Sequence, residues 1–312
     1  MTKGVDRKIV LVTRRTRLEE LVQKHHTLDQ AKFYLEQLGA DFADYRREHE
    51  AYLDGRRVTL EVLEAHGRYQ VIDRGFLPNF LFGPSDVVIA LGQDGLVANT
   101  LKYLDGHPLV GINPEAGRYD GILLPFAPRD LATILPDILA DKRKHKTVSM
   151  AEVRLMDGQR LRAVNDLFVG PRSHGSARYE IALGDRREVQ SSSGLIVATG
   201  LGSTAWMKSV ITGAFGVAAA FATGGVDLPE IVARPWDDQE LAFAVREPFP
   251  SQTSQASLIC GRIAPPGTLR LRSLMPENGV IFSDGIEADH LTFAAGMEAT
   301  IGLSSRRGRL IV

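Results

Sequence analysis

The residues best suited to chemistry form a glycine-rich stretch, Gly92-Gln93-Asp94-Gly95. A short run of branched apolar residues, 87–91, precedes it, and apolar residues at helical spacing follow it. The pattern predicts a strand, a tight turn and a helix. Glycines at the carboxyl end of such a strand allow backbone N–H groups to approach a phosphate at the start of the helix.

Asp94 is unusual in a turn of this kind, because a carboxylate repels a phosphate. The charge becomes useful if Asp94 holds a metal ion or accepts a proton from an attacking hydroxyl. The alternative interpretation is that Asp94 and Gly95 only make a turn and cap the helix, since short Gly/Asp motifs are common.

Three pieces from the second half of the chain could complete a ligand site: Asn165-Asp166, residues 193–206 and Ser283-Asp284-Gly285. The middle piece predicts a buried strand that enters a Gly/Ser/Thr turn and then a helix. Trp206 could stack on a base, and the Asn165 amide could pair with the edge of one. The alternatives are a turn or cap at Asn165-Asp166, core packing for Trp206 and an ordinary hairpin turn at Asp284.

The elements that must position these residues divide the chain in two. Over residues 1–140 strands alternate with helices, which predicts an α/β domain with a doubly wound parallel sheet. The expected strands are 8–13, 41–45, 69–72, 87–91 and 108–113, and the expected helices are 28–38, 58–66, 96–104 and 129–140.

Residues 147–312 predict a β-rich second domain, because short apolar runs alternate with Asp-Gly, Gly-Asp and Asn-Gly turns. A buried helix is expected at 211–223 and a loop at 227–238. The expected strands are 148–155, 161–169, 177–183, 195–198, 241–246, 255–259, 268–274, 280–282, 290–293 and 299–303.

Composition favours an ordinary soluble globular protein. Of the 312 residues, 44% are hydrophobic and 24% charged, and the net charge of -1 gives no reason to expect nucleic acid or an anionic membrane as a partner. The single cysteine, Cys260, cannot form an intrachain disulfide, and no segment approaches the ~20 apolar residues of a membrane span. These features predict a cytoplasmic protein. A transit peptide is disfavoured, since a strand already begins near Lys8.

Taken in this order and spacing, the pieces resemble the NAD kinase family. The family's Gly-Gly-Asp-Gly-Thr turn matches residues 92–96, its Asn-Glu pair matches Asn165-Asp166, and its Gly-Ser-Thr-Ala-Tyr turn matches residues 202–206. The likeness covers nearly the whole chain. It is greatest to the mitochondrial-type branch, at residues 192–195, 200–206, 111–114, Arg246-Glu247-Pro248 and the helix start at His25-His26.

The resemblance implies an α/β domain followed by a β-rich domain, assembled as a homodimer or larger homo-oligomer. It implies transfer of the γ-phosphate of ATP, with Mg²⁺ or another divalent cation, to the 2'-hydroxyl of the adenosine ribose of NAD, giving NADP. Asp94 would be the catalytic carboxylate and a possible ligand of Mg²⁺. Phosphates would lie against Gly92, Gln93 and Gly95, and NAD would bind at Asn165, Asp166, Thr204, Ala205, Trp206 and Asp284.

The sequence also departs from the family pattern. Gln93 and Leu96 replace the second glycine and the threonine of the first turn, Ser193 and Leu201 replace an Asp and a hydroxyl residue, and Asp166 is shorter than the usual Glu. Two alternatives therefore stay open: a catalytically weak or silent sensor that binds NAD(P) or another nucleotide, and a lipid or sugar kinase of the same superfold. A Rossmann dehydrogenase is disfavoured, because no Gly-x-Gly-x-x-Gly follows Val12.

Overall fold

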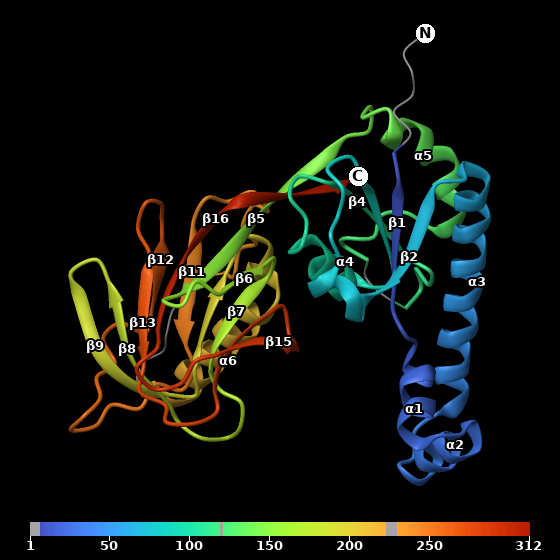
Figure 1. Ribbon diagram of the computed structural model, residues 1–312. Helices are drawn as coiled ribbons and strands as arrows, with labels where there is room; N and C mark the ends of the chain where they lie inside the picture. Colours follow the sequence, from blue (N-terminus) through green and yellow to red (C-terminus); the bar gives the residue numbers. More distant parts are fainter. Residues whose placement is uncertain (1–6, 119–120, 223–229) are drawn as a thin grey trace. The chain divides into compact units, whose positions relative to one another are not determined.

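The computed structural model describes residues 7–118, 121–222 and 230–312. Two compact units make up the chain, one formed by Met1–Lys146 with Arg309–Val312 and the other by Thr147–Gly308 (Figure 1). The fold combines a mixed α/β sheet with an antiparallel β-sheet domain, as the sequence predicts. In the part of the chain that is described, no helix is both long and apolar enough to cross a bilayer.

The first unit is built on a parallel sheet. Its strands lie in the order β2 (Tyr69–Asp73), β1 (Ile9–Thr13), β3 (Val87–Leu91) and β4 (Pro108–Ile112), followed by the end of β16 (Glu298–Ile311), and all these neighbours are parallel. Every residue of β1, β3 and β4 is buried, which explains why these strands are continuous apolar runs. Because the chain crosses from β2 over β1 to β3, a topological switch point lies between β1 and β3.

The helices of this unit are α1 (Arg17–His25), α2 (Leu28–Gln37), α3 (Phe42–His66), α4 (Asp94–Leu101) and α5 (Leu131–Leu139), with short 3₁₀ turns η1 (Arg74–Asn79) and η2 (Pro128–Asp130). The strand predicted at 41–45 is wrong. Asp41 instead caps α3, its side chain accepting the Ala43 N–H at 2.9 Å. The helix predicted at 58–66 is the last part of α3, which ends at Gly67 with φ 89°.

The second unit packs two antiparallel sheets around one core. One sheet has the order β12 (Cys260–Ile263), β11 (Leu241–Val245), β10 (Leu195–Ala198), β7 (Asp166–Pro171), β14 (Gly279–Ser283) and β15 (Ile286–Thr292). The other joins β16 to β13 (Leu269–Ser273), β8 (Ala177–Leu183) and β9 (Arg186–Ser192), while β5 (His145–Leu155) pairs with β16 and β6 (Arg160–Ala163). Buried side chains from both sheets form one cluster, including Leu167 and Val197 from the first and Ile181 and Leu271 from the second.

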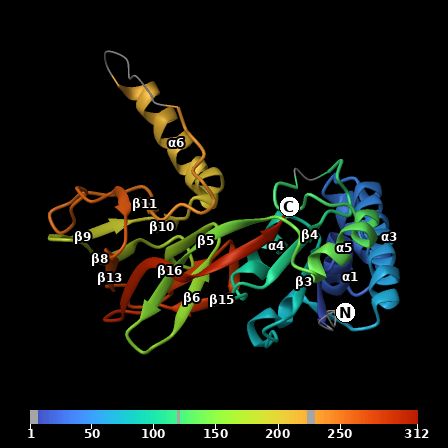
Figure 2. The ribbon, with the colours of Figure 1, turned by 90° about the horizontal axis from the view of Figure 1, so that it is seen from above.

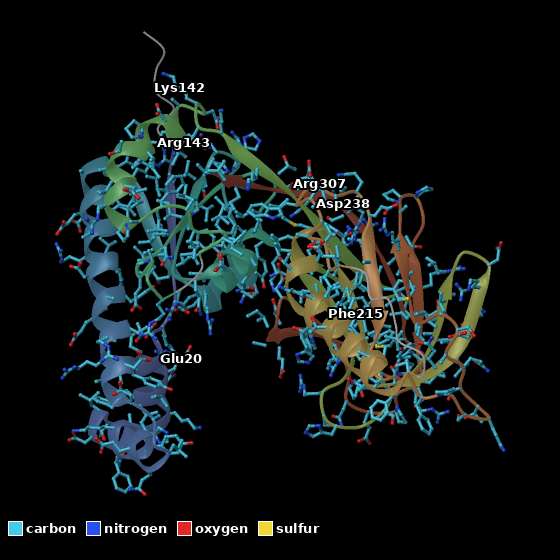
Figure 3. All side chains as sticks on the ribbon, turned by 180° about the vertical axis from the view of Figure 1, so that it is seen from behind. Glu20, Lys142, Arg143, Phe215, Asp238 and Arg307 are labelled. Carbon is cyan, nitrogen blue, oxygen red and sulfur yellow. The ribbon has the colours of Figure 1, made fainter. Side chains whose placement is uncertain are left out.

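Several predictions for the second unit need correction. The strand predicted at 161–169 is two strands, β6 and β7, and residues 255–259 form no strand before β12. The helix predicted at 211–223 begins earlier as α6 (Trp206–Phe221), and only Met207 among its residues is buried. Figure 2 shows α6 extending away from the strands of its own unit, and Figure 3 marks Phe215 along it. Residue 223 and residues 227–229 of the predicted loop lie outside the described residues.

Candidate functional site

The first glycine-rich turn lies at the switch point of the parallel sheet. The Gly92 N–H donates to the Ile112 carbonyl at 3.0 Å, which fixes the turn to the end of β4. Gln93 is the N-cap residue of α4, with extended backbone and no side-chain capping bond. Its carbonyl accepts the N–H groups of Leu96 and Val97 at 2.8 and 3.3 Å. The helix therefore begins at Asp94, with free backbone donors expected in its first turn.

Asp94 is half-buried and, among the residues that the structure describes, one hydrogen bond holds its carboxylate in place. Its Oδ1 accepts the backbone N–H of Leu123 at 2.7 Å. That bond engages one of the two carboxylate oxygens, so the other can face a ligand. A negative charge in the first turn is also favoured by the helix dipole. The carboxylate is thus positioned without being enclosed.

The two glycines of this turn differ in what surrounds them. A Cβ at Gly92 would meet Leu96 Cδ2 at 3.0 Å and Arg14 Nε at 3.3 Å, whereas a Cβ at Gly95 would meet nothing within 4 Å. Packing therefore favours glycine at position 92 and makes no such demand at 95. Gly95 leaves its backbone open to an approaching group.

Arg14, which was not predicted as a site residue, follows β1 at the switch point. It is buried, its Nη2 donates to Glu48 Oε1 at 2.7 Å, and its guanidinium carbon lies 5.0 Å from the centre of the Tyr52 ring. Among the residues the structure describes, Arg14 Nε has no hydrogen-bond partner. A buried cation with a free donor beside Gly92 favours an anion there. The sequence signal was a charged residue directly after a fully buried strand.

The turn also suits a magnesium ion held mainly by a substrate. Within residues 7–118, 121–222 and 230–312, no group of three or more His, Cys, Asp or Glu side chains could hold a metal. Mg²⁺ commonly binds through one or two carboxylates together with substrate phosphates and water. Asp94 can supply one such carboxylate, so the residues fit a cation that arrives with its phosphates.

In the second unit, the structure brings Asp284 together with Asn165 and Asp166. The Asp284 carboxylate accepts the backbone N–H groups of Val164, Asn165 and Asp166 at 3.1, 2.6 and 3.4 Å. Its own N–H donates to the Asp166 carbonyl at 3.0 Å, and its backbone is left-handed, with φ 53°. Asp284 thus fixes the short segment between β6 and β7 that carries Asn165.

Asp166 is a buried carboxyl group in a negatively charged neighbourhood. Asp166 is only 4% exposed to solvent. Burial, and then the charge of Asp284, raise the pKa of Asp166 to about 7. Near neutral pH the carboxyl group therefore retains its proton in a large fraction of molecules, and it can donate as well as accept a hydrogen bond.

The second glycine-rich turn follows β10 and leads through η3 (Leu201–Thr204) into α6. The Thr199 N–H donates to the Asn165 carbonyl at 2.9 Å, and the Gly202 N–H donates to Thr199 Oγ1 at 3.1 Å. A Cβ at Gly202 would overlap the Asn165 carbonyl, and one at Gly200 would overlap the Pro235 carbonyl. Both glycines are needed for this close backbone packing.

Trp206 lies at the end of that turn, half-buried. One side packs against the small cluster of Ile196, Ala198, Met207 and Ala244. The ring is also stacked with Phe168, with centroids 5.5 Å apart and planes inclined by 16°. Trp206 therefore both packs on the sheet and lines a pocket with Phe168 and Phe282, neither of which was predicted as a site residue.

Comparison with known proteins points to one family. No family model matches the chain. Over 134 residues it is 38% identical to the NAD kinase of Burkholderia cenocepacia (strain HI2424), covering 40% of this chain and 43% of that protein. It is 34% identical to the NAD kinase of Cupriavidus pinatubonensis over the same length and coverage. The chain is related to NAD kinases. The match spans less than half the length of these curated relatives.

Solved structures of NAD kinases share the fold. The crystal structure of yeast NADH kinase complexed with NADH gives a TM-score of 0.60 at 14% identity, covering 98% of this chain and 83% of that chain. The crystal structure of an NAD kinase from Archaeoglobus fulgidus in complex with ATP gives a TM-score of 0.54 at 15% identity. The match covers 97% of this chain and 93% of that chain. These likenesses confirm the NAD kinase-like fold that the sequence predicted.

The predicted site residues of this NAD kinase relative fall into two groups. Gly92, Gln93, Asp94 and Gly95 form one turn of the first unit. In the second unit, Asn165, Asp166 and Asp284 share one hydrogen-bonded segment, and Thr204, Ala205 and Trp206 follow the turn that bonds to it. Thr204 is exposed and Ala205 half-buried.

Proposed function

We propose that the protein is an NAD kinase, which transfers the γ-phosphate of ATP to the 2'-hydroxyl of the adenosine ribose of NAD and yields NADP. The observation that carries the proposal is the Asp94 carboxylate, held by the Leu123 N–H in a turn where Gly95 is open and the buried cation of Arg14 lies beside Gly92. The sequence relationship to NAD kinases supports it.

Asp94 would orient the acceptor hydroxyl and take its proton as the oxygen attacks the γ-phosphorus. The bond from that phosphorus to the bridging oxygen of ADP then breaks, and ADP leaves. The backbone at Gly92 and Gly95, the side chain of Gln93 and the free Nε of Arg14 would hold phosphate oxygens. Mg²⁺, if bound by Asp94 and the phosphates, would neutralise charge on the transferred group.

The adenosine end of NAD would bind in the second unit. The Asn165 amide and the protonated Asp166 offer hydrogen bonds to base and ribose, while Thr204, Ala205 and Trp206 line the adenine. Asp284 would act through the segment that it holds, since its carboxylate accepts three backbone N–H groups there.

The resemblance to the NAD kinase family supports the further proposal that this kinase is a homodimer or larger homo-oligomer, and the resemblance to its mitochondrial-type branch stays a proposal as well. Light scattering on the purified protein measures its mass. A cytoplasmic location stays a prediction from the sequence, based on its single cysteine.

The sensor alternative is favoured by one feature of the same turn. Gln93 stands where the family has glycine, and its half-buried side chain makes no capping bond with α4. It either obstructs the phosphates or replaces a backbone donor with its amide. Gln93→Gly separates these outcomes: a gain in ATP affinity or turnover indicates obstruction in a protein that has lost chemistry, and a loss indicates a phosphate ligand in a working kinase.

The direct test is to incubate purified protein with NAD, ATP and Mg²⁺ and to measure NADP with an NADP-specific dehydrogenase. A kinase accumulates NADP with time and enzyme concentration. A protein that binds NAD but forms no NADP is a sensor, and the kinase proposal is then wrong.

A further inference from the structure

The pocket beside Trp206 is small and has mixed chemistry. It has a volume of about 190 Å³ and lies wholly within the second unit, and its lining includes Phe168, Trp206, Phe282, Arg172 and Arg246. Pockets that enclose a whole drug-sized ligand measure roughly 300–1,000 Å³. This pocket can therefore take only one part of a dinucleotide.

Its apolar side consists of aromatic rings. Phe168 and Trp206 are stacked, and the ring centroids of Phe282 and Phe168 are 4.8 Å apart. The Phe168 ring lies close over the backbone at Gly194, the residue before β10, since a Cβ there would come within 2.8 Å of the ring. The rings thus form one apolar side of the pocket, and an aromatic side of this kind suits a planar heterocycle.

Arg246 lies above these rings. Its guanidinium carbon is 5.3 Å from the centre of the Trp206 ring and 6.0 Å from that of Phe168. The backbone of Arg246 is held on both sides: its N–H donates to the Gly194 carbonyl at 2.8 Å, and its carbonyl accepts the backbone N–H of Ser193 at 2.9 Å. The side chain therefore starts from a fixed backbone position.

The backbone next to Arg246 is strained. Glu247 is left-handed, with φ 42°, a conformation that is unfavourable for a residue other than glycine and is concentrated at ligand sites. The Glu247 carboxylate is exposed and lies 3.8 Å from Arg246 Nη2. A long exposed ion pair of this kind contributes little, so Arg246 keeps donors for a ligand.

A second arginine lines the same pocket. Arg172 Nη2 donates to the His290 ring, and the Glu287 carbonyl accepts a hydrogen bond from His290 Nδ1 at 2.9 Å. The histidine therefore orients Arg172. The Glu287 carboxylate also lies at the pocket, on an exposed residue.

We propose that Arg246 and Arg172 bind the 5'-phosphate of the adenine nucleotide whose base stacks on Trp206. The proposal rests on the proposed function in taking the adenosine half of NAD as the ligand of this unit. A guanidinium offers paired N–H donors that match two phosphate oxygens, and its plane can also stack on an aromatic ring. The ligand class is a nucleoside 5'-phosphate, and the phosphate is the group that the arginines recognise.

The test compares AMP with adenosine, because the two ligands differ only in that phosphate. Affinities are measured by calorimetry for the wild type, Arg246→Gln and Arg172→Gln, with Arg270→Gln as a control that removes an exposed arginine of β13 outside the pocket. We expect each pocket variant to bind AMP about tenfold more weakly, or about 1.4 kcal/mol, with adenosine and the control unchanged. Arg246→Lys keeps the charge and should lose less.

Three results overturn the proposal. The wild type could bind AMP no more tightly than adenosine, both variants could bind AMP normally, or AMP and adenosine affinities could fall equally, which would give the arginines a packing role alone. The assay needs no turnover, so it is separable from the kinase test. Absence of NADP formation together with a phosphate-dependent loss would leave this pocket assigned and remove the proposed activity.

Discussion

Both glycine-rich turns follow a buried strand and lead into a helix, one from β3 into α4 and the other from β10 through η3 into α6. Their glycines serve different purposes. In the second turn, Gly200 and Gly202 touch carbonyl groups that leave no space for a methyl group. In the first, Gly95 faces open space. Glycine alone thus does not indicate a ligand site, and the open position is the informative one.

The carboxyl side chains of the two regions also differ, in their burial and in the number of their hydrogen-bond partners. Within the described part of the chain, the Asp94 carboxylate of the first turn has one backbone partner, and the residue is half-buried. In the second unit Asp284 has three backbone partners and Asp166 is buried. This difference supports our proposal that chemistry takes place in the first region and that the second positions the ligand.

The largest expected effect is on turnover. Asp94→Asn keeps the shape of the side chain and removes the base, so kcat should fall by about 10²- to 10⁴-fold, while NAD affinity changes little. Steady-state kinetics and NAD titration measure the two quantities. If kcat is unchanged in Asp94→Asn, the first turn is not the catalytic region, and the proposed distinction between the two regions is wrong.

Asp166 should make the stability of the second unit depend on pH. Because the pKa of Asp166 is raised to about 7 in the folded protein, the native state binds more protons than the unfolded state between about pH 4 and 7. Stability should fall as pH rises through this range, by up to about 4 kcal/mol from this group, and Asp166→Asn should remove the fall. Urea unfolding at several pH values, followed by tryptophan fluorescence, measures it. An identical pH slope in the variant would contradict the assignment.

Gly202→Ala and Gly95→Ala form a matched pair. The first places a methyl group against the Asn165 carbonyl and should destabilise the second unit by about 3 kcal/mol. The second should leave stability equal or slightly higher, because alanine is favoured in a helix by roughly 0.5–1 kcal/mol. It should nevertheless raise KM for ATP. If Gly95→Ala leaves the KM for ATP unchanged, the backbone of residue 95 does not contact the phosphates.

A moderate effect on binding is expected at Trp206. Trp206→Ala should weaken NAD binding by roughly 1–3 kcal/mol, as for the loss of one base-aromatic stack. NAD titration together with thermal unfolding measures binding and stability separately. A variant that unfolds more easily but binds NAD normally would place Trp206 among the packing residues alone.

Much of the fold could be predicted because local pattern decides it. The apolar runs that become β1, β3 and β4 are buried on both faces, and the turn residues between β8, β10 and their neighbours mark separate strands. One exception is α3, whose many charged residues hide its helical period and made its start resemble a strand. The exposed α6 was predicted as buried because its composition is apolar all round.

Site residues were harder to predict when their surroundings come from distant elements. Asp284 bonds to the N–H of Asn165 across 119 positions of sequence. The burial of Arg14 depends on Glu48 and Tyr52 from α3, and the pocket position of Arg246 depends on rings from β7, α6 and β14. No local pattern contains these contacts. The sequence therefore predicted the glycine-rich turns but not the arginines that lie beside them.

The most direct test of the central claim follows the phosphate itself. Purified protein is incubated with NAD, Mg²⁺ and ATP labelled at the γ-phosphate, and NADP is isolated and counted. An NAD kinase acting through Asp94 gives NADP carrying one labelled phosphate per molecule, and Asp94→Asn gives almost none. Unlabelled NADP, or equal labelling by wild type and Asp94→Asn, would contradict the account.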